Sequence, residues 1–451
     1  MAIKLLIGGS PCTHWSIAQK NNRETKPEGL GWELFKNYLI AKEKFKPDYF
    51  LYENNKSASQ DIKDQIAFEL GVDVDPGVRF TYINSALVSA QNRQRFYVTN
   101  FGDIEQPEDR GILLKDILET GCPRYEKAHC IDANYYKGGN ASSFNKQSGQ
   151  RMLALEPVRI PEYGNVNKSR PVRASYAYKG SGEGSLVTEA FPENPNKQVS
   201  DYVAEPLSPF IENKLGIFSD KYGYIPEMFN PYNKAEVKDK SPTLTTGCGT
   251  QTNSATVLKF DSISYATPIE WDEQGRPTKA VSCADGKVYT VYEVKDGIIT
   301  IKGKEYPIKL ADGFYIIRKL TVKECCRLQT MPDDYCKAVS DSQAYKGLGN
   351  GWTAEVIIHL LNHALKDVPR DEEIIVLSMY DGIGTGRHCL DKMGFTNVKY
   401  YAYEIDKYPI AISMDNYPDI IQCGDAFAVR EDEWKPPKSR REWLNEMLGG
   451  V

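Results

Sequence analysis

The chain has 451 residues, with 56 Lys and Arg against 61 Asp and Glu, which gives a formal net charge of −5. At roughly 100–200 residues per domain this length predicts two or three domains, and 41% hydrophobic with 26% charged residues exclude disorder by composition. No run approaches the ~18 apolar residues that span a bilayer and residues 1–7 are too short for a signal peptide, so we expect a cytoplasmic protein without a membrane partner.

The first 120 residues alternate short apolar runs with helical patterns, which is typical of βαβ units around a parallel sheet. The elements predicted there, in chain order, are a strand at 3–7, a helix at 32–43, a strand at 49–52, a helix at 61–70 and a strand at 96–98. Residues 121–315 are rich in Gly, Asn, Ser, Pro and Tyr without a long helical period. We therefore expect a smaller loop- and β-rich domain in the middle of the chain.

Two helical patterns, at 321–329 and 353–365, fall within residues 316–366 and are predicted to return the chain to the first domain. The polar, proline-containing stretch 367–373 is predicted to be a linker. Residues 374–451 open with renewed strand–helix alternation, so the expected fold class is α/β.

The middle region also carries its own charge. Over 121–185, ten Lys and Arg face five Asp and Glu, a net charge of +5 that leaves −10 for the rest of the chain. Aromatic side chains alternate with these charges: Tyr135, Tyr136, Phe144, Tyr163, Tyr176 and Tyr178. Such a mixture favours a polyanion-binding surface, although a solvated loop explains the charge alone equally well.

A glycine-rich turn follows the buried run at 374–379. It reads Tyr380-Asp381-Gly382-Ile383-Gly384-Thr385-Gly386, and the next predicted strand ends on Glu404, 22 residues after Gly382. Glycines let the backbone approach a ligand, and an acidic residue about 20 positions later can bind ribose hydroxyls. A third acidic strand end, at Asp425, is placed to meet an adenine edge. The pattern predicts a nucleoside cofactor and leaves NAD, S-adenosylmethionine and a structural turn open, with a phosphate-poor cofactor slightly favoured.

Reactive side chains lie at the ends of the N-terminal strands. Gly8-Gly9-Ser10-Pro11-Cys12 follows the first strand, Glu53-Asn54 ends the second, and Gln91-x-Arg93-x-Arg95 precedes Phe96. The two arginines, one residue apart, face the same side of an extended segment. An isolated cysteine is more often inert, but a thiol, a carboxylate and a guanidinium at successive strand ends converge on one crevice. We therefore expect Cys12 to be a nucleophile.

Together these motifs resemble those of the DNA (cytosine-5) methyltransferase family. Pro11-Cys12, Glu53-Asn54 and Gln91-x-Arg93-x-Arg95 are similar to its Pro-Cys, Glu-Asn-Val and Gln-x-Arg-x-Arg motifs. The glycine-rich turn, Glu404 and Gly424-Asp425 are similar to its three S-adenosylmethionine motifs. Arg318 to Asp333 and Gly349-Asn350-Gly351-Trp352-Thr353 resemble its last two motifs. The resemblance covers the chain except for its variable middle.

The motif order departs from that of the family, which begins with the glycine-rich loop and ends with the Gly-Asn motif. Here the nucleophile motif comes first and the cofactor motifs come last, so we expect a circular permutation, which is tolerated where the joined ends lie close together. The implied fold is a permuted, Rossmann-like S-adenosylmethionine-dependent methyltransferase sheet with a target-recognition domain at 121–315. Ser10, Asn55 and Tyr380 replace the usual Pro, Val and Phe without removing a reacting group.

The resemblance implies a role for each residue of the site. As catalytic residues it implies Cys12, which attacks carbon-6 of a flipped cytosine, Glu53 oriented by Asn54, and Arg95 assisted by Arg93. It implies cofactor binding by Pro11, Asn350, Gly351, Trp352, Tyr380, Asp381, Gly382, Ile383, Gly384, Thr385, Gly386, Glu404, Ile405, Asp425 and Ala426. It implies DNA binding by Ser16, Lys20, Arg23, Thr245, Thr246 and Gly247.

The implied cofactor is S-adenosylmethionine and the implied partner is double-stranded DNA, bound by a monomeric, bacterial or phage-encoded enzyme associated with the nucleoid. Three alternatives stay open: an NAD-dependent oxidoreductase, a catalytically idle DNA-binding regulator and a tRNA cytosine methyltransferase. None of the three explains the Cys12, Glu53 and arginine motifs together with the large middle domain as well. We expect no metal, since His359 and His363 lack a third ligand motif, and no disulfide framework among the ten cysteines.

Overall fold

The computed structural model describes residues 2–11, 14–16, 23–137, 153–158, 228–230, 235–236, 258–259, 266–432 and 434. The chain divides into two compact units, residues 1–155 with 317–451, and residues 156–316. The first unit therefore combines the N-terminal and C-terminal regions. Of the predicted site residues, Cys12, Lys20 and Thr245 to Gly247 lie outside the described residues.

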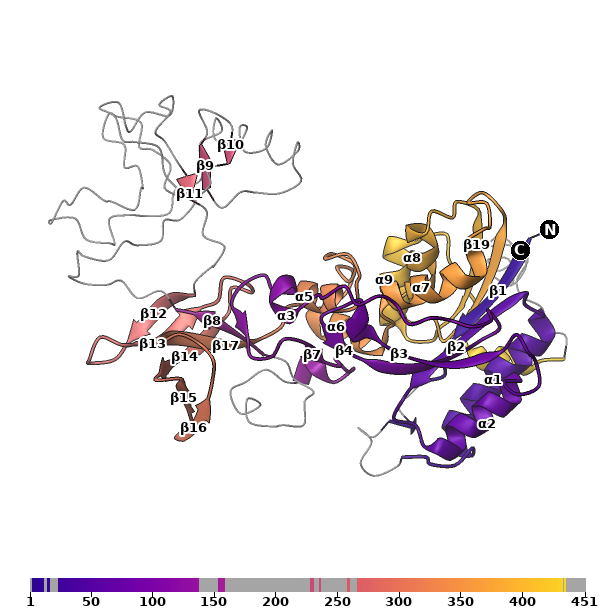
Figure 1. Cartoon of the computed structure of the whole chain (residues 1–451), viewed down its shortest axis with the longest axis horizontal. Helices are drawn as coiled ribbons and strands as arrows, with labels where there is room; N and C mark the ends of the chain where they lie inside the picture. The colour runs from indigo at the N-terminus through magenta and orange to yellow at the C-terminus, as the bar shows by residue number, and fades with distance from the viewer. Residues whose placement is uncertain are drawn as a thin grey trace, which may run out of the picture. The chain divides into compact units, whose positions relative to one another are not determined.

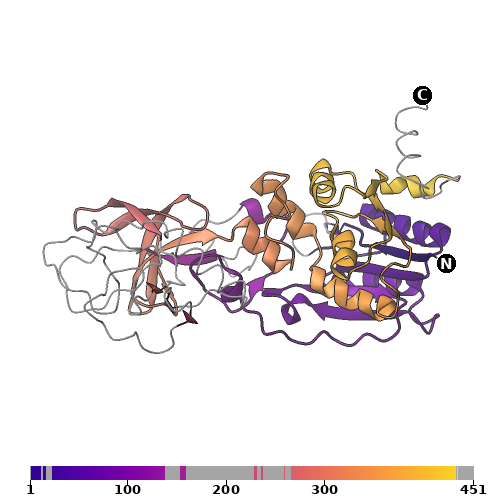
Figure 2. The same ribbon diagram turned by 90° about the horizontal axis from the view of Figure 1, so that it is seen from above.

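A seven-stranded sheet forms the centre of the first unit, in the order β20–β19–β18–β1–β2–β5–β3. The bounds are β1 (Ile3–Gly8), β2 (Tyr49–Asn55), β3 (Arg79–Asn84), β5 (Gln94–Thr99), β18 (Ile374–Met379), β19 (Val398–Tyr403) and β20 (Ile421–Gln422). The strands from β20 to β2 are parallel, whereas β5 runs antiparallel to both β2 and β3. Strands from the two ends of the sequence thus lie side by side in one sheet (Figure 1; Figure 2).

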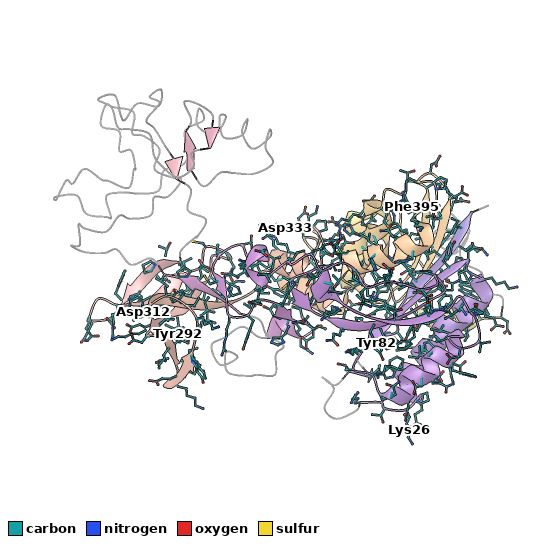
Figure 3. All side chains as sticks on the ribbon, viewed as in Figure 1. Lys26, Tyr82, Tyr292, Asp312, Asp333 and Phe395 are labelled. Atoms are coloured by element: carbon teal, nitrogen blue, oxygen red, sulfur yellow. The ribbon has the colours of Figure 1, made fainter. Side chains whose placement is uncertain are left out.

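Helices cover both faces of this sheet because successive strand residues point to opposite sides. Leu6 and Leu377 belong to the core on the side of α1 (Gly29–Phe45) and α2 (Gln60–Leu70). Leu5 and Val376 belong to the opposite core. The helices contributing to that second core are α5 (Val322–Leu328), α6 (Asp341–Asn350), α7 (Ala354–Leu365), α8 (Thr385–Lys392) and α9 (Lys407–Asn416). Figure 3 shows side chains filling both layers, with Phe395 on the side of α7 and α8.

Short elements complete the first unit. They are η2 (Ser85–Leu87), β4 (Gln91–Asn92), α3 (Leu114–Ile117), β6 (Cys122–Pro123), β7 (Ala128–His129), η3 (Tyr135–Lys137) and η6 (Ala426–Arg430). The strand β8 (Leu153–Pro157) pairs with β6 through Leu155 and Ala154. None of the helices among the described residues combines the length and the apolar character needed to cross a membrane.

The second unit consists, in its described part, of antiparallel strands. They are β9 (Met228–Asn230), β10 (Ala235–Glu236), β11 (Leu258–Lys259), β12 (Thr267–Trp271), β13 (Pro277–Val281), β14 (Val288–Lys295), β15 (Ile298–Ile301) and β16 (Lys304–Pro307). The strand β17 (Gly313–Lys319) pairs with β14 and leads back to the first unit. Among the described residues of this unit, one core cluster has Val158, Ala266, Ala280 and Ile316 at its centre.

The helices and strands predicted for the first unit are present in the structure. It also contains α6 and β3, which were not predicted. The helix α6 contains Gly347 and Gly349, and glycine lowers helix propensity by about 1 kcal/mol, so its sequence did not predict a helix. Packing explains these glycines. A Cβ atom at Gly349 would lie 2.1 Å from the carbonyl carbon of Asp132, and one at Gly347 would lie 2.8 Å from Cγ2 of Ile383.

Candidate active site

The motif residues gather at one edge of the central sheet. The strands β1, β2, β18, β19 and β20 are parallel, so their carboxyl ends lie at the same edge. The strand β5 runs in the opposite direction, and its amino end therefore reaches this edge, with Arg95 opposite Asn55 of β2. The predicted convergence of carboxylate and guanidinium groups is present.

Glu53 is the centre of the reacting half of this edge. Its Oε1 forms an ion pair with Nε of Arg95 at 2.8 Å. Its Oε2 accepts a hydrogen bond of 3.0 Å from the indole Nε1 of Trp352. Glu53 is 9% exposed and Arg95 is 8% exposed, so both charges lie where water screens them weakly. Each oxygen of the carboxylate thus has its own donor.

Two glycines bring the nucleophile loop against this carboxylate. A Cβ atom at Gly9 would lie 2.4 Å from the carbonyl oxygen of Glu53, and one at Gly8 would lie 2.5 Å from that of Met379. The loop that leads to Pro11 and Cys12 therefore passes directly over the ends of β2 and β18. A side chain at either position would displace this loop from Glu53.

Asn54 holds the same loop. Its Nδ2 donates to the carbonyl oxygen of Ser10 at 2.9 Å and to the hydroxyl of Tyr52 at 3.1 Å. The hydroxyls of Ser10 and Tyr52 share a further hydrogen bond of 2.8 Å. These bonds differ from the expectation that Asn54 orients Glu53. Asn54 instead anchors the residues just before Cys12.

Arg93 also differs from its expected role beside Arg95. It lies between β4 and β5, outside both strands. Its guanidinium and that of Arg95 both reach the sulfur of Cys130, as expected of two side chains on one side of the segment. Arg93 is buried and donates to the carbonyl oxygens of Ile131 at 3.0 Å, Gly349 at 3.2 Å and Gly351 at 2.7 Å. Its donors bind backbone, so Arg93 shapes the site and Arg95 faces the carboxylate.

Cys130 is a member of the site that no motif predicted. Its Sγ accepts from Arg93 at 3.2 Å and lies 3.9 Å from Nη2 of Arg95. Burial raises the pKa of Cys130, but the charges of Arg93 and Arg95 together lower it more, so the pKa lies below its usual value. The signal that could have indicated it is weak, because Cys130 is 37 residues from Arg93.

Buried amide side chains and a buried ion pair lie next to the turn at 349–353 and in the segment 318–333. Gln329 accepts from Thr353 at 2.9 Å and donates to the carbonyl oxygen of Leu348 at 2.6 Å. Gln91 donates to Gln329 at 3.2 Å. Arg318 and Glu324, both fully buried, pair at 2.8 Å, and Glu324 closes a capping box at the start of α5. These contacts assign the motif at 318–333 to holding the turn at 349–353.

The cofactor half begins at the glycine-rich turn. Tyr380, Gly382 and Gly384 have φ angles of 61°, 61° and 79°, in the left-handed region that favours glycine. A Cβ atom at Gly382 would meet no described atom within 4 Å, so the backbone here faces open space. A Cβ atom at Gly386 would lie 2.3 Å from Cδ1 of Ile7, which packs the start of α8 on β1. The turn is thus open to a ligand on one side.

Glu404 and Asp425 lie at the carboxyl ends of β19 and β20, and backbone amides orient both. Glu404 accepts from the N–H groups of Gly382 at 3.0 Å and of Ile405 and Asp406 at 2.8 Å. Asp425 accepts from the N–H of Phe427 at 2.9 Å. Ile405 is 73% exposed and Phe427 37% exposed. Acceptors for hydroxyl and amino groups beside uncovered apolar side chains suit a nucleoside.

Asp381 and Tyr380 have structural contacts where cofactor contacts were expected. Asp381 is buried, and its Oδ1 accepts from Ser378 at 2.7 Å and Tyr400 at 2.6 Å, while its Oδ2 has no partner among the described residues. Burial raises the pKa of Asp381 to about 6. The hydroxyl of Tyr380 donates to the carbonyl oxygen of Leu34 at 2.7 Å, which ties the turn to α1.

The Gly-Asn turn connects the two halves. A Cβ atom at Gly351 would lie 3.3 Å from Cδ1 of Ile383, in the glycine-rich turn. The next residue, Trp352, reaches Glu53. Asn350 is exposed at the end of α6. One short segment therefore contacts both the cofactor half and the reacting half.

Two of the residues expected to bind DNA are part of the scaffold as well. Arg23 donates to the carbonyl oxygens of Trp15 at 3.1 Å and Ser57 at 2.5 Å. Glu24 accepts from the indole of the buried Trp15 at 3.1 Å. Ser16, half-buried, also has a partner. These contacts hold residues 14–16 beside residues 23–24.

No group of three or more His, Cys, Asp and Glu among the described residues has the arrangement of a metal site. His359 and His363 contact each other with ring centroids 5.2 Å apart. His359 bonds through Nε2 to the carbonyl oxygen of Glu105 at 2.8 Å. The pair is therefore part of the surface packing of α7.

The fold is that of a Rossmann-like α/β protein, with an acid–guanidinium pair at the edge of the sheet where the parallel strands end. The model of the family C-5 cytosine-specific DNA methylase matches residues 1–110 and 191–366, more than half of the chain. The chain belongs to this family and is a DNA (cytosine-5) methyltransferase by class.

Individual proteins similar to this chain share about a quarter of their aligned residues with it or fewer. The orphan methyltransferase M.SPRI of Bacillus phage SPR is 25% identical over 380 residues, which cover 78% of this chain and 80% of that protein. The orphan methyltransferase M.Rho11sI of Bacillus phage rho11s is 26% identical over 142 residues, 29% of this chain and 27% of that protein. A solved structure of a Spodoptera frugiperda DNMT2 mutant aligns with a TM-score of 0.32 and 12% identity over 80% of this chain and 78% of that one.

Proposed function

We propose that this enzyme transfers a methyl group from S-adenosylmethionine to carbon-5 of a cytosine flipped out of a specific sequence in double-stranded DNA, through a covalent adduct with Cys12. The observation that carries this proposal is the Glu53 carboxylate, held by Arg95 and Trp352 directly beneath the loop that leads to Cys12. An acid, a guanidinium and a thiol loop at one sheet edge are the groups that this reaction needs.

The chain's own residues account for the activation of the base. The Cys12 thiolate adds to carbon-6, and the electron pair of the 5,6 double bond becomes available at carbon-5. Glu53 supplies a proton to ring N3 and so neutralises the charge that develops on the ring. Arg95 donates to the cytosine O2 while it holds Glu53. Asn54 and the glycines Gly8 and Gly9 keep the thiol loop at the distance that attack requires.

The cofactor site fits S-adenosylmethionine, which when bound supplies the methyl group as an electrophilic sulfonium. Glu404 would accept from the ribose hydroxyls and Asp425 from the adenine amino group. Ile405 and Phe427 would cover the faces of the adenine, since both are exposed beside these acids. After transfer, a water molecule takes the proton from carbon-5 and N3 returns its proton to Glu53. The 5,6 double bond then forms again as the Cys12 sulfur leaves carbon-6 as a thiolate.

The proposed substrate is double-stranded DNA because the target base must leave a helix to reach a site at the sheet edge. The excess of basic residues over 121–185 supports a polyanionic partner. We further propose that the enzyme acts as a monomer in the cytoplasm of a bacterium, where its DNA substrate lies.

Trapping tests the proposal directly. The protein is incubated with labelled S-adenosylmethionine and duplex DNA that contains 5-fluorocytosine, whose fluorine blocks the final loss from carbon-5. We expect an adduct that survives denaturing electrophoresis in the wild type and in Cys283→Ala, which removes an exposed thiol, and no adduct in Cys12→Ala. A missing adduct, or one that Cys12→Ala still forms, overturns the mechanism, and adducts only on RNA overturn the substrate. Bisulfite sequencing of modified DNA then gives the target sequence.

A further inference from the structure

Trp352 lies in a predicted cofactor-binding turn, but its side chain contacts the predicted catalytic acid Glu53. It belongs to the Gly-Asn turn, which the resemblance assigns to the cofactor. Its indole Nε1 nevertheless donates to Oε2 of Glu53 at 3.0 Å, across 299 residues of sequence. The side chain is half-buried, and its polar atom is directed to the acid of the reacting half.

This hydrogen bond completes the fixation of the Glu53 carboxylate. Nε of Arg95 holds Oε1 at 2.8 Å, and Trp352 holds Oε2. A carboxylate held at one oxygen can still turn about its last bond, whereas donors at both oxygens define its plane. Among the described residues each oxygen has one donor, which leaves a second position where the acid can hold a proton toward a substrate nitrogen.

The turn that carries Trp352 is itself rigid. Arg93 donates to the carbonyl oxygens of Gly349 and Gly351, on either side of Asn350. Gln329 donates to the carbonyl oxygen of Leu348 at 2.6 Å. The indole thus projects from a backbone that buried side chains hold in place. On its other side, Gly351 packs against Ile383 of the glycine-rich turn.

We propose that Trp352 is a positioning residue of the reaction: its indole N–H sets the plane of the Glu53 carboxylate and links that carboxylate to the cofactor-binding turn. The inference rests on the proposed function, in which Glu53 acts on the flipped cytosine. It changes the role of Trp352 from a cofactor contact to a support of the acid.

The decisive variant is Trp352→Phe, which keeps an aromatic ring and removes the donor. We expect kcat to fall about ten- to hundredfold, since a misplaced catalytic group costs on that order, with KM for S-adenosylmethionine within about twofold. The matched control is Trp434→Phe, whose indole N–H donates to the hydroxyl of Tyr403, and which should retain the wild-type kcat. An unchanged kcat in Trp352→Phe, or a raised KM with an unchanged kcat, overturns the proposal.

A double-mutant cycle separates positioning from a general structural effect. In a Glu53→Gln background, Trp352→Phe should lower kcat less than about twofold further, because the group that it positions is already lost. An equal further loss overturns the proposal. Trp352→His, which keeps a ring N–H, should retain more kcat than Trp352→Phe, and a loss as large as that of Phe also overturns it. The trapping experiment tests the proposed function, which is refuted if the wild type forms no adduct with DNA. The variants described here test only the role of Trp352.

Discussion

Glu53 and Glu404 are both acids at the carboxyl end of a strand of the same sheet, and the chain holds them in different ways. Glu404 accepts from three backbone N–H groups, two of which belong to the next two residues. Glu53 accepts from the side chains of Arg95 and Trp352, which come from distant elements. The acid of the cofactor half is therefore oriented by local backbone, and the acid of the reacting half by the whole fold.

The difference has a functional reason. A cofactor that binds the same way in each cycle needs an acceptor of constant direction, and backbone amides give one. An acid that gives up a proton during the reaction becomes a carboxylate, and a fixed positive charge beside it stabilises that charged form. Arg95 gives such a charge, and it lies beside the sulfur of Cys130 as well.

The sharpest test of the comparison is Glu53→Gln. We expect kcat to fall about 100- to 10,000-fold, because general acid catalysis contributes on that order, while KM for S-adenosylmethionine stays within about twofold. Steady-state methyl transfer to duplex DNA measures both. A large rise in KM for S-adenosylmethionine without a loss of kcat would contradict the assignment of Glu53 to the reaction and indicate a role in cofactor binding.

The counterpart is Glu404→Gln. We expect KM for S-adenosylmethionine to rise about ten- to hundredfold, since hydrogen bonds to charged groups contribute about 1.5–3 kcal/mol, with kcat at saturating cofactor largely retained. Glu373→Gln is the matched control, because Glu373 pairs with Lys399 near the opposite end of β19. Equal effects of both variants would contradict the assignment of Glu404 to the ribose.

Asp381 tests the cofactor half through stability. Burial raises its pKa to about 6 in the folded state, against about 3.9 unfolded. The folded state thus binds more protons between pH 4 and 6, and stability falls as the pH rises through this window. Relative to Asp381→Asn, the free energy of unfolding of the wild type should fall by about 2–3 kcal/mol from pH 4 to pH 7. Urea unfolding at several pH values measures the free energy of unfolding of both proteins. If it depends on pH in the same way in the wild type and in Asp381→Asn, the prediction is wrong.

The smallest expected effect concerns two half-buried thiols. Burial is offset by Arg93 and Arg95 at Cys130, whose pKa is lowered, whereas burial alone raises the pKa of Cys122. In a Cys12→Ala background at pH 8, iodoacetamide should therefore alkylate Cys130 several-fold faster than Cys122. Peptide mass spectrometry reports the two rates. Faster labelling of Cys122 would contradict the prediction that Arg93 and Arg95 lower the pKa of Cys130.

The sequence predicted those parts of the site that depend on strand ends. Glycines with left-handed φ angles and acids after short apolar runs are local signals, and they located the glycine-rich turn, Glu404 and Asp425. Glu53 and Arg95 were expected at one edge of the sheet from their strand-end positions. The antiparallel direction of β5, which brings its first residues to the end of β2, was not predicted.

The contacts that the sequence did not predict are those of side chains joined across the fold. The bond from Trp352 to Glu53, the backbone contacts of Arg93 and the position of Cys130 depend on how α6 and the segment after β7 pack on the sheet. Asn54 was assigned to its sequence neighbour Glu53, but successive residues of a strand point to opposite faces. Its amide accordingly reaches Ser10.

We infer the circular permutation from two independent observations. If β18 is counted as the first strand, the parallel strands follow the order 3-2-1-4-5, the common order of doubly wound sheets. Counted from β1, the order is irregular. The family model also stops at residue 366, just before the predicted linker and the cofactor strands. The strand order and the extent of the family match both support the proposal that the cofactor part is displaced to the C-terminal region.

The place of β1 in the sheet has a consequence for how the protein is made. The strand lies between β18 and β2, and Ile3 pairs with Ile374. A nascent chain can form β1 against β2 early, but the other edge of β1 stays uncovered until the ribosome has released residue 379. Exposed apolar strand edges invite aggregation, so β1 is prone to aggregation until β18 has been synthesised. The parallel part of the sheet, whose carboxyl edge holds the candidate site, is therefore completed only when the C-terminal strands have been synthesised.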